Sequence, residues 1–213
     1  PPGIDLDTFR PLTEVQSRGG VILAIGRTNP LKNLPLTIDS WRAMAPQPEL
    51  WMFGIEPELG ERYGARYVEA PTDEGVKELI NTAGAFVQTS VHEGFCLPPL
   101  EAMAAGTPVV CTDAPGHRDF CRHEENCLLV EAEPHAIADA LQRVLADDGL
   151  RRRLVDEGRE TAAGYAWDKR IDELEAFLRS VAASAVLGED AQPTSGVASP
   201  ANGAAAQGSR TSP

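Results

Sequence analysis

A short segment of the sequence, residues 92–101, carries two acidic side chains in a pattern that suits carbohydrate chemistry. Glu93 and Glu101 lie eight residues apart, and each carboxylate can accept hydrogen bonds from sugar or ribose hydroxyl groups. Gly94 lacks a side chain where a ligand must come near. Taken singly, Glu93 is also explained as an exposed turn residue and Glu101 as a first-turn acid favoured by the helix dipole. Together they favour a binding loop for a ligand rich in hydroxyl groups.

The end of this segment predicts an anion site at the start of a helix. Pro98 keeps Leu97 extended, and proline is tolerated at the first helical position because its missing N–H costs nothing there. The backbone amides of Phe95, Cys96 and Leu97 can therefore point outward beside a helix N-terminus. Such a terminus attracts phosphate, because its free N–H groups and the helix dipole both favour negative charge.

A second loop, residues 26–33, places two cations directly after an apolar run. Gly26 permits close backbone approach. Arg27 can grip a phosphate with two hydrogen bonds and Lys32 adds a point charge, so the pair suits a diphosphate. The alternative, which the pair by itself would favour, is two solvated surface charges. A third loop, residues 112–119, either shapes a sugar pocket or is an ordinary connection between a strand and a helix.

Metal binding is a competing explanation for the cysteines and histidines in this region. Five potential ligands lie within a short stretch: Cys111, His117, Cys121, His123 and Cys127. Zinc requires four convergent ligands, usually in tighter paired spacing, and two of these cysteines fall in apolar, strand-like runs. We therefore predict no metal site and interpret the four cysteines of the chain as buried free thiols in a reducing compartment.

The hydrophobic pattern predicts the framework that positions these loops. Apolar runs predict strands at residues 21–25, 50–54, 67–68, 85–87, 108–111 and 127–130. Helical spacing predicts helices at residues 34–45, 73–82 and 99–105, and three more from residue 134 onward, the last at 167–181. This alternation is typical of an α/β protein with a Rossmann-like, doubly wound parallel sheet, followed here by C-terminal helices. Ligands bind at the carboxyl ends of such strands, where all three loops would lie.

Length and composition indicate the domain organisation. The 213 residues suffice for one domain with a sizeable core but not for two full α/β domains. We predict a folded domain over residues 1–182 and a disordered tail over residues 183–213, because the tail has few apolar side chains to bury. The chain begins with Pro1 rather than Met, which suggests a fragment of a longer protein; a separately encoded single-domain subunit is the alternative.

The charge balance argues against nucleic acid as a partner. The formal net charge is −13, from 19 Lys and Arg against 32 Asp and Glu, whereas nucleic-acid binding needs clustered positive charge. No apolar run approaches the roughly 20 residues of a membrane helix, and no signal peptide is visible. We expect a cytoplasmic location, with a peripheral position at the inner face of a membrane as the alternative.

Residues 1–182 resemble the C-terminal, nucleotide-sugar-binding domain of family 4 retaining glycosyltransferases, which have the two-domain GT-B fold. Residues 93–110 closely match the family's signature of two glutamates separated by seven residues, and this long match is highly specific. Arg27 and Lys32 look like the family's pair of cations for the donor diphosphate, a weak match without the signature. Cys96 departs from the pattern, since family members often have glycine there.

The resemblance implies roles for individual residues. The implied catalytic residues are Glu93, which would contact the donor sugar, and Arg27 and Lys32, which would neutralise the leaving diphosphate. The implied donor-binding residues are Gly26, Gly94, Phe95, Cys96, Leu97 and Glu101, the last at the ribose. The loop at residues 68–71 would frame the nucleobase. No metal or other cofactor is implied, because the nucleotide sugar is a substrate.

The implied activity is transfer of a sugar from a nucleotide diphosphate donor to an unknown acceptor, with retention at the anomeric carbon. The acceptor site would belong to an N-terminal GT-B domain, supplied in cis or by a partner chain, so we expect this domain to be inactive alone. Two alternatives remain: a non-catalytic nucleotide-sugar-binding subunit that pairs with a separate acceptor domain, and a GT-B nucleotide-sugar epimerase. The sequence does not specify the base, the sugar or the acceptor.

Overall fold

The computed structural model describes residues 2–12 and 19–189 of the chain. The chain divides into two compact units, Pro1–Glu173 and Leu174–Pro213. The first unit contains the whole sheet and every candidate site residue. Most of the predicted disordered tail lies outside the described residues, and the predicted domain boundary stays a prediction.

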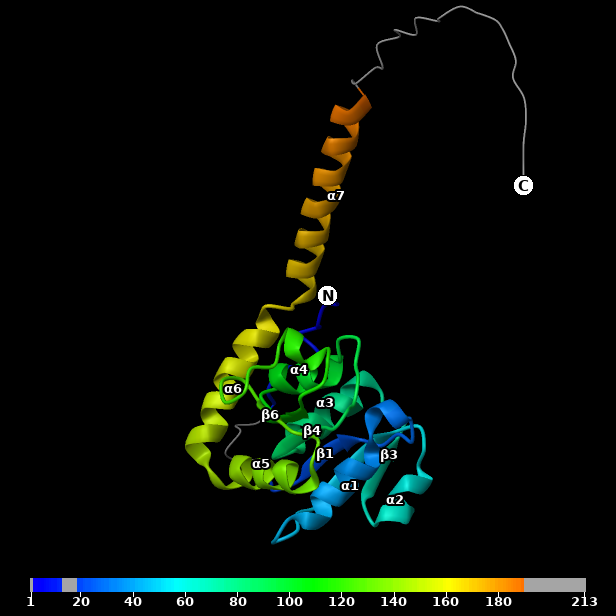
Figure 1. Ribbon diagram of the computed structural model, residues 1–213, viewed down its shortest axis with the longest axis vertical. Helices are drawn as coiled ribbons and strands as arrows, with labels where there is room; N and C mark the ends of the chain where they lie inside the picture. Colours follow the sequence, from blue (N-terminus) through cyan, green and yellow to red (C-terminus); the bar gives the residue numbers. More distant parts are fainter. Residues whose placement is uncertain (1, 13–18, 190–213) are drawn as a thin grey trace, which may run out of the picture. The chain divides into compact units, whose positions relative to one another are not determined.

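Six parallel strands form one sheet in the order β3-β2-β1-β4-β5-β6 (Figure 1). The strands are β1 (Ile22–Ile25), β2 (Leu50–Gly54), β3 (Arg66–Glu69), β4 (Ala85–Gln88), β5 (Val109–Thr112) and β6 (Leu128–Val130). β1 and β4 pair in the middle of the sheet, although β2 and β3 separate them in the sequence. The chain therefore reverses its direction across the sheet between β1 and β4, which makes this the topological switch point. The predicted doubly wound parallel sheet is confirmed.

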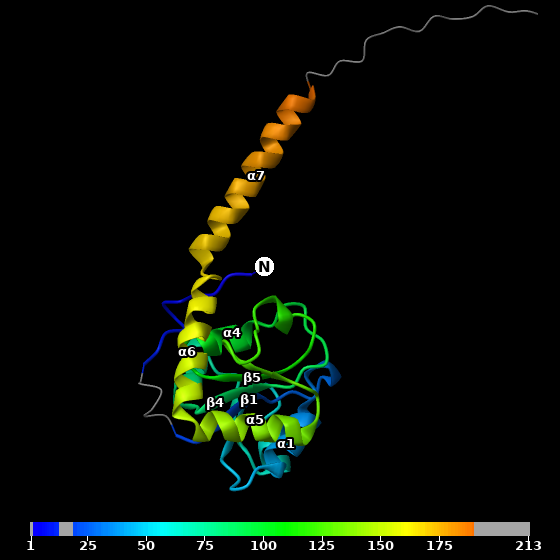
Figure 2. The ribbon, with the colours of Figure 1, turned by 60° about the vertical axis from the view of Figure 1, so that its left-hand side comes forward.

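Helices cover both faces of this sheet. They belong to the set α1 (Leu34–Ala43), α2 (Glu58–Tyr63), α3 (Asp73–Thr82), α4 (Leu97–Ala104), α5 (Pro134–Ala146) and α6 (Asp148–Ala163), with 3-10 turns η2 (Pro30–Lys32) and η3 (His117–Asp119). The last helix, α7 (Trp167–Glu189), extends into the second unit. Figure 2 shows α1 and α5 on one side of the central strands and α4 on the other. α6 packs against both α4 and α5, so it closes one edge of the layered domain.

Two apolar cores lie on opposite faces of the sheet. In β1, Ile22 and Ala24 belong to the core shared with α1 and α5, whereas Leu23 belongs to the core shared with α3 and α4. A strand covered on both faces buries every side chain, so it appears in the sequence as a continuous apolar run. This burial explains why apolar runs located the strands correctly.

Three local features of the fold did not follow from the sequence pattern. α2 has only six residues, which is less than two turns and too short for a helical period to show. η2 is shorter still. α4 begins at Leu97 rather than at the predicted Pro99, because prolines in the first turn of a helix need no N–H partner there.

The second unit presents an uncovered apolar face. Leu174, Phe177, Leu178 and Val181 follow helical spacing along α7, and each of these side chains is exposed. A helix of this kind ordinarily buries its apolar stripe against another surface. No helix in the part of the chain that the structure describes is long and apolar enough to cross a membrane.

Candidate functional site

The loops that follow β1 and β4 lie side by side at the switch point. The Val91 N–H donates to the carbonyl oxygen of Leu31 at 2.9 Å, which joins the loop after β4 to η2 in the loop after β1. Thr89 Oγ1 lies 3.1 Å from the carbonyl oxygen of Asn33 and adds a second link. Pairing of β1 with β4 therefore brings together two loops that are about 60 residues apart in the sequence.

A tyrosine from β3 fixes the end of β1. Tyr67 Oη donates to the carbonyl oxygen of Gly26 at 2.7 Å and accepts from the Glu56 N–H at 3.0 Å. A Cβ atom on Gly26 would lie 2.4 Å from Cε2 of the tyrosine ring. A Cβ atom on Gly54, which ends β2, would lie 2.6 Å from the Gly26 carbonyl oxygen. Both positions therefore require glycine, because neighbouring groups fill the space that a side chain would need.

Lys32 and Glu93 form an ion pair across the two loops. Lys32 Nζ lies 2.6 Å from Glu93 Oε1, and Ser90 Oγ donates to the same oxygen at 2.5 Å. Only 12% of the Glu93 side chain is exposed. Burial by itself would raise the pKa of Glu93, but the hydrogen bonds from Lys32 and Ser90 outweigh it and hold the pKa below its usual value. Glu93 is therefore a carboxylate at neutral pH.

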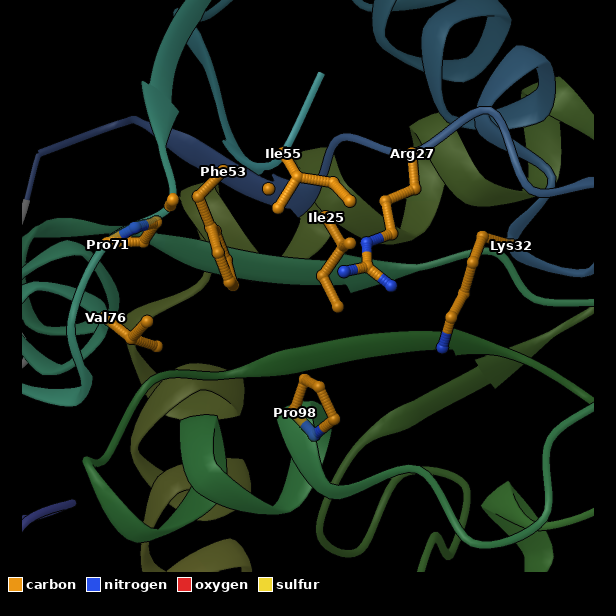
Figure 3. A pocket seen from close by; sticks show the side chains of 10 residues that line it. Ile25, Arg27, Lys32, Phe53, Ile55, Pro71, Val76 and Pro98 are labelled. Atoms are coloured by element: carbon orange, nitrogen blue, oxygen red, sulfur yellow. The ribbon is translucent and has the colours of Figure 1, made fainter. Parts of the chain in front are cut away.

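A pocket of about 340 Å³ opens beside this ion pair (Figure 3). Arg27 and Lys32 lie along one side of the pocket, and Phe53, Pro71 and Val76 lie along the other. Arg27 is exposed and makes no hydrogen bond or ion pair with any described residue. The pocket thus has a cationic end and an apolar end, and its volume is typical of small-molecule sites.

The N-terminus of α4 adjoins the pocket, since Pro98 in its first turn is a lining residue. Cys96 is the N-cap residue and adopts a left-handed conformation, with φ 73° and ψ 81°. Its side chain accepts no capping hydrogen bond from the helix. Pro98 and Pro99 have no N–H, so Leu97 supplies the backbone amide at the start of α4 that can receive an anion.

Glu101 lies half-buried on α4, one turn beyond the helix start. Burial, and then repulsion from the Asp73 carboxylate, raise the pKa of Glu101 to about 7. Asp73 is the first residue of α3. Its effect on Glu101 shows that the start of α3 lies near the first turns of α4. Close to neutral pH, Glu101 can therefore exist in either protonation state.

The loop after β5 packs directly against Glu93. The Glu93 N–H donates to the carbonyl oxygen of Pro115 at 3.2 Å. Gly116 has φ 88°, and a Cβ atom there would lie 2.7 Å from the Glu93 carbonyl oxygen. His117 is completely buried, and its Nδ1 lies 2.8 Å from the carbonyl oxygen of Thr112. All three loops selected from the sequence therefore meet at one edge of the sheet.

Some of the predicted site residues line one of two hollows. Arg27 and Lys32 line the main pocket, whereas Gly94 and Phe95 line a second hollow of about 470 Å³. A Cβ atom on Gly94 would meet no described atom within 4 Å, so the space beside this glycine is open. Among the described residues, Glu101 lines neither hollow.

The remaining predicted residues lie next to lining residues of the main pocket. Gly26 follows Ile25, and Leu97 and Cys96 precede Pro98. The loop expected to frame a nucleobase, residues 68–71, contributes Ala70 and Pro71 to the lining. Their roles as binding residues remain predictions.

Sequence reasoning missed several side chains that shape the site. Phe53 lies at the carboxyl end of β2 and Val76 on the first turns of α3, and both line the main pocket. Tyr67 and Ser90 hold the site through the hydrogen bonds described above. The carboxyl end of a predicted strand was a usable signal for Phe53, whereas the Tyr67 contact depends on the pairing of β2 with β3.

The fold and the site define an open α/β domain that binds ligands where its strand order reverses. The profile of the family described as glycosyl transferases group 1 matches residues 7–161. The chain belongs to this family, family 4 of the glycosyltransferases, and forms a nucleotide-sugar-binding, C-terminal domain of the GT-B fold.

Solved structures share the fold of this chain. A sucrose-phosphate synthase from Thermosynechococcus elongatus is 26% identical with a TM-score of 0.75, and the match covers 86% of this chain and 52% of that one. The C-terminal domain of a glycosyl transferase group 1 family protein from Francisella tularensis is 22% identical with a TM-score of 0.64, and the match covers 78% of this chain and 100% of that one. The Anabaena protein HepE, solved in complex with UDP-glucose, shares the fold at 20% identity and a TM-score of 0.72, over 84% of this chain and 56% of that one.

A curated relative shows the same partial coverage. A D-inositol 3-phosphate glycosyltransferase from Geodermatophilus obscurus is 30% identical, and the match covers 85% of this chain but 47% of the relative. The chain thus spans about half the length of this relative.

Proposed function

We propose that this chain binds a nucleoside diphosphate sugar, and that the whole protein transfers the sugar to an acceptor with retention at the anomeric carbon. The observation that carries the proposal is the pocket at the switch point, which joins a cationic end to an apolar end. Arg27 and Lys32 are matched to two phosphates, since Arg can bind phosphate through two hydrogen bonds and Lys adds a point charge. The apolar end suits the flat face of a nucleobase.

Further donor contacts follow from the two glutamates. In the proposed complex Glu101 accepts hydrogen bonds from the ribose hydroxyl groups, which requires its ionised form. Glu93 accepts hydrogen bonds from hydroxyl groups of the transferred sugar and is already ionised because of Lys32. The N–H of Leu97, at the uncapped start of α4, donates to a phosphate oxygen or to a sugar hydroxyl group.

The two cations also account for how the sugar leaves. As the bond between sugar and diphosphate breaks, negative charge develops on the phosphate oxygens. Positively charged groups held in a fixed position stabilise that charge without reorganising. Arg27 makes no hydrogen bond or ion pair with a described residue, so its N–H groups are available to the diphosphate. Lys32 divides its charge between Glu93 and the diphosphate.

The acceptor site belongs to a second domain in this proposal. The chain corresponds to about half of its curated relative, which leaves room for a further domain in the whole protein. Without an acceptor site facing the bound donor, the sugar is not transferred efficiently, because catalysis depends on holding both reactants in position. We therefore expect donor binding without sugar transfer from the isolated chain.

Calorimetric titration of the chain with uridine, guanosine and adenosine diphosphates tests the proposal. We expect at least one of these nucleotides to bind, and no sugar transfer from its sugar conjugate. Glu101→Ala should weaken binding of the free nucleotide by roughly 1–3 kcal/mol. Glu93→Ala should weaken binding of the sugar conjugate more than binding of the free nucleotide. No binding of any of the three at millimolar concentration would reject the proposal, and equal effects of the two variants would reject the division of roles.

A further inference from the structure

Three potential metal ligands converge beside the proposed donor site. Glu93, Cys96 and His117 each place one ligating atom within 4.8 Å of those of the other two. They come from the loop after β4, the N-cap of α4 and the turn η3 after β5. The sequence gives no sign of this cluster, because its members are spread over 25 residues and share no spacing typical of metal sites.

His117 offers a lone pair that nothing in the described chain uses. Its Nδ1 lies 2.8 Å from the carbonyl oxygen of Thr112, and a carbonyl oxygen can only accept. Nδ1 must therefore carry the proton, which leaves Nε2 of the neutral ring as an acceptor. Nε2 is buried and has no hydrogen-bond partner among the described residues. An unpaired buried acceptor is costly, and a carbonyl partner on the far nitrogen is the usual support of a metal-binding histidine.

Cys96 occupies a backbone conformation that favours glycine. Its φ of 73° is rarely adopted by residues with a side chain. Its thiol forms a hydrogen bond with Glu93, and the residue is buried, with 8% of its surface exposed. Strain of this kind persists at positions where the side chain serves the site. The strained backbone therefore directs a sulfur ligand toward Glu93.

Glu93 can bind a cation without losing its other partners. Lys32 and Ser90 both donate to Oε1 of Glu93 and neither donates to Oε2. Once a cation displaces the thiol proton, the carboxylate and the thiolate carry two negative charges against the single charge of Lys32. Before the cation enters, the thiol keeps its proton and the charges of Glu93 and Lys32 cancel. The cluster gains its net negative charge only as the thiol proton is released to solvent on cation binding.

We propose that Glu93, Cys96 and His117 form a binding site for a divalent cation of the zinc class. A thiolate, an imidazole and a carboxylate are ligands that zinc accepts, whereas magnesium and calcium prefer oxygen atoms only. Zinc bond lengths place neighbouring ligand atoms about 3.4 Å apart in a tetrahedral site, so the three side chains need to move together by only about 1 Å. The fourth position remains open to water.

This site overlaps the donor site, because Glu93 is the carboxylate assigned to the donor sugar. A bound cation holds Glu93 and excludes the sugar from it. This consequence rests on the proposed function: the cation competes with the donor and takes no part in the transfer.

Titration of the metal-free chain with Co²⁺ tests the site directly. Cobalt is a spectroscopic substitute for zinc, and a bound thiolate gives an intense charge-transfer absorption. We expect one equivalent of Co²⁺ to bind with this absorption and to be displaced by Zn²⁺. Cys96→Gly and His117→Gln should weaken binding by more than the roughly 10–100-fold that loss of an outer-shell partner costs. His92→Gln, an exposed histidine of the same loop, should bind as the original chain does.

Cys96→Gly keeps this test independent of folding, because glycine adopts a positive φ without strain. Its melting temperature should be no lower than that of the original chain. Co²⁺ binding without the thiolate absorption would overturn the proposal. So would unchanged binding in Cys96→Gly, which would assign the cation to the other cysteines, or an equal loss in His92→Gln.

Competition between cation and donor is measured by calorimetry of nucleotide binding with Zn²⁺ or with a chelator. Because diphosphates also bind Zn²⁺ in solution, the same titrations are made with Cys96→Gly, and only the additional weakening in the original chain counts. Equal weakening in both would overturn the competition. Nucleotide binding in chelator alone tests the proposed function, and Co²⁺ binding without nucleotide tests the metal site, so a failure of either is distinguishable.

Discussion

The two ends of the sheet each have a hollow of similar size but of different character. At the carboxyl ends of the strands the main pocket measures about 340 Å³. At the amino end of β2 a different hollow, lined by Trp41, Trp51 and Arg66, measures about 330 Å³. In the hollow at the amino end, Trp41 Nε1 donates to the carbonyl oxygen of Pro48 at 2.7 Å, and Trp51 Nε1 donates to the Glu49 carboxylate at 2.9 Å. Arg66 stacks on the Trp51 ring, with its Cζ 4.0 Å from the ring centroid.

Volume therefore does not distinguish a site from a surface depression, but unused polar groups do. The aromatic N–H groups and the cation at the amino end already have partners inside the chain. At the carboxyl end Arg27 has neither a hydrogen bond nor an ion pair with described residues, and the buried Nε2 of His117 has no partner there. Groups whose bonding capacity is unused can give it to a ligand.

Removing one arginine from each end tests the comparison most strongly. Arg27→Ala should weaken nucleoside diphosphate binding by about 1.5–3 kcal/mol, the usual loss for a hydrogen bond that involves a charged group. Arg66→Ala removes the same charge from the opposite end and should leave nucleotide affinity unchanged. Calorimetry on both variants provides the measurement. Equal losses would mean that only net charge matters, and the distinction between the two ends would fail.

Two glycines of the site differ in the space around them, since Gly26 is enclosed by neighbouring atoms and Gly94 faces open space. Gly26→Ala should lower the free energy of unfolding by about 1–3 kcal/mol, because the new methyl group would meet the Tyr67 ring. Gly94→Ala is the matched control: no described atom lies near its Cβ position, so the change should stay within about 0.5 kcal/mol. Urea denaturation measures both. A costly Gly94→Ala would show that the open space is filled.

The pH dependence of nucleotide binding examines Glu101. With a pKa of about 7, this carboxyl group is roughly 10% ionised at pH 6 and 90% ionised at pH 8. If the ribose needs the carboxylate, affinity should rise by up to about tenfold between these values. Glu101→Gln should remove the part of the pH dependence that does not come from the nucleotide phosphates. An identical pH profile in the variant would exclude Glu101 from the site.

Stability should respond to Glu101 in the opposite direction. The folded-state pKa of about 7 lies above the ordinary value of 4.5, so the folded chain binds the proton more tightly than the unfolded chain does. This contribution is fully present below about pH 4.5 and is lost as the pH rises toward 7. Melting curves should therefore show Glu101→Gln gaining on the original chain between pH 5 and pH 8.

The sequence predicted the sheet well, because the central strands β1, β4 and β5 are buried on both faces and their apolar runs are a local signal. It also selected Arg27, Lys32 and Glu93, but not the 2.6 Å ion pair between the last two. That pair exists because β1 lies beside β4, and the order of strands is a property of the whole fold. Local patterns carry the residue types of the site, whereas the contacts depend on topology.

His117 illustrates the same limit. The pattern of cysteines and histidines led to the prediction of no metal site, since spacing alone argued against zinc. In the folded chain His117 faces two residues, Glu93 and Cys96, that were assigned to a different purpose. Its burial and its bond to Thr112 arise from η3 turning back onto the end of β5. No local pattern in the sequence indicates that this turn places the His117 side chain beside Glu93 and Cys96.

The smallest predicted effect concerns the stacked arginine at the amino end. Arg66→Ala should reduce the free energy of unfolding by about 0.5–1 kcal/mol, as expected for an exposed cation over an aromatic ring. Arg42→Ala is a graded control, because Arg42 lies farther, at 5.9 Å, from the Tyr63 ring and should cost less. Urea denaturation with a common slope measures both. If Arg66→Ala changed nothing in stability while weakening nucleotide binding, the amino-end arginine would be free for a ligand, and unused bonding capacity would no longer separate the two ends.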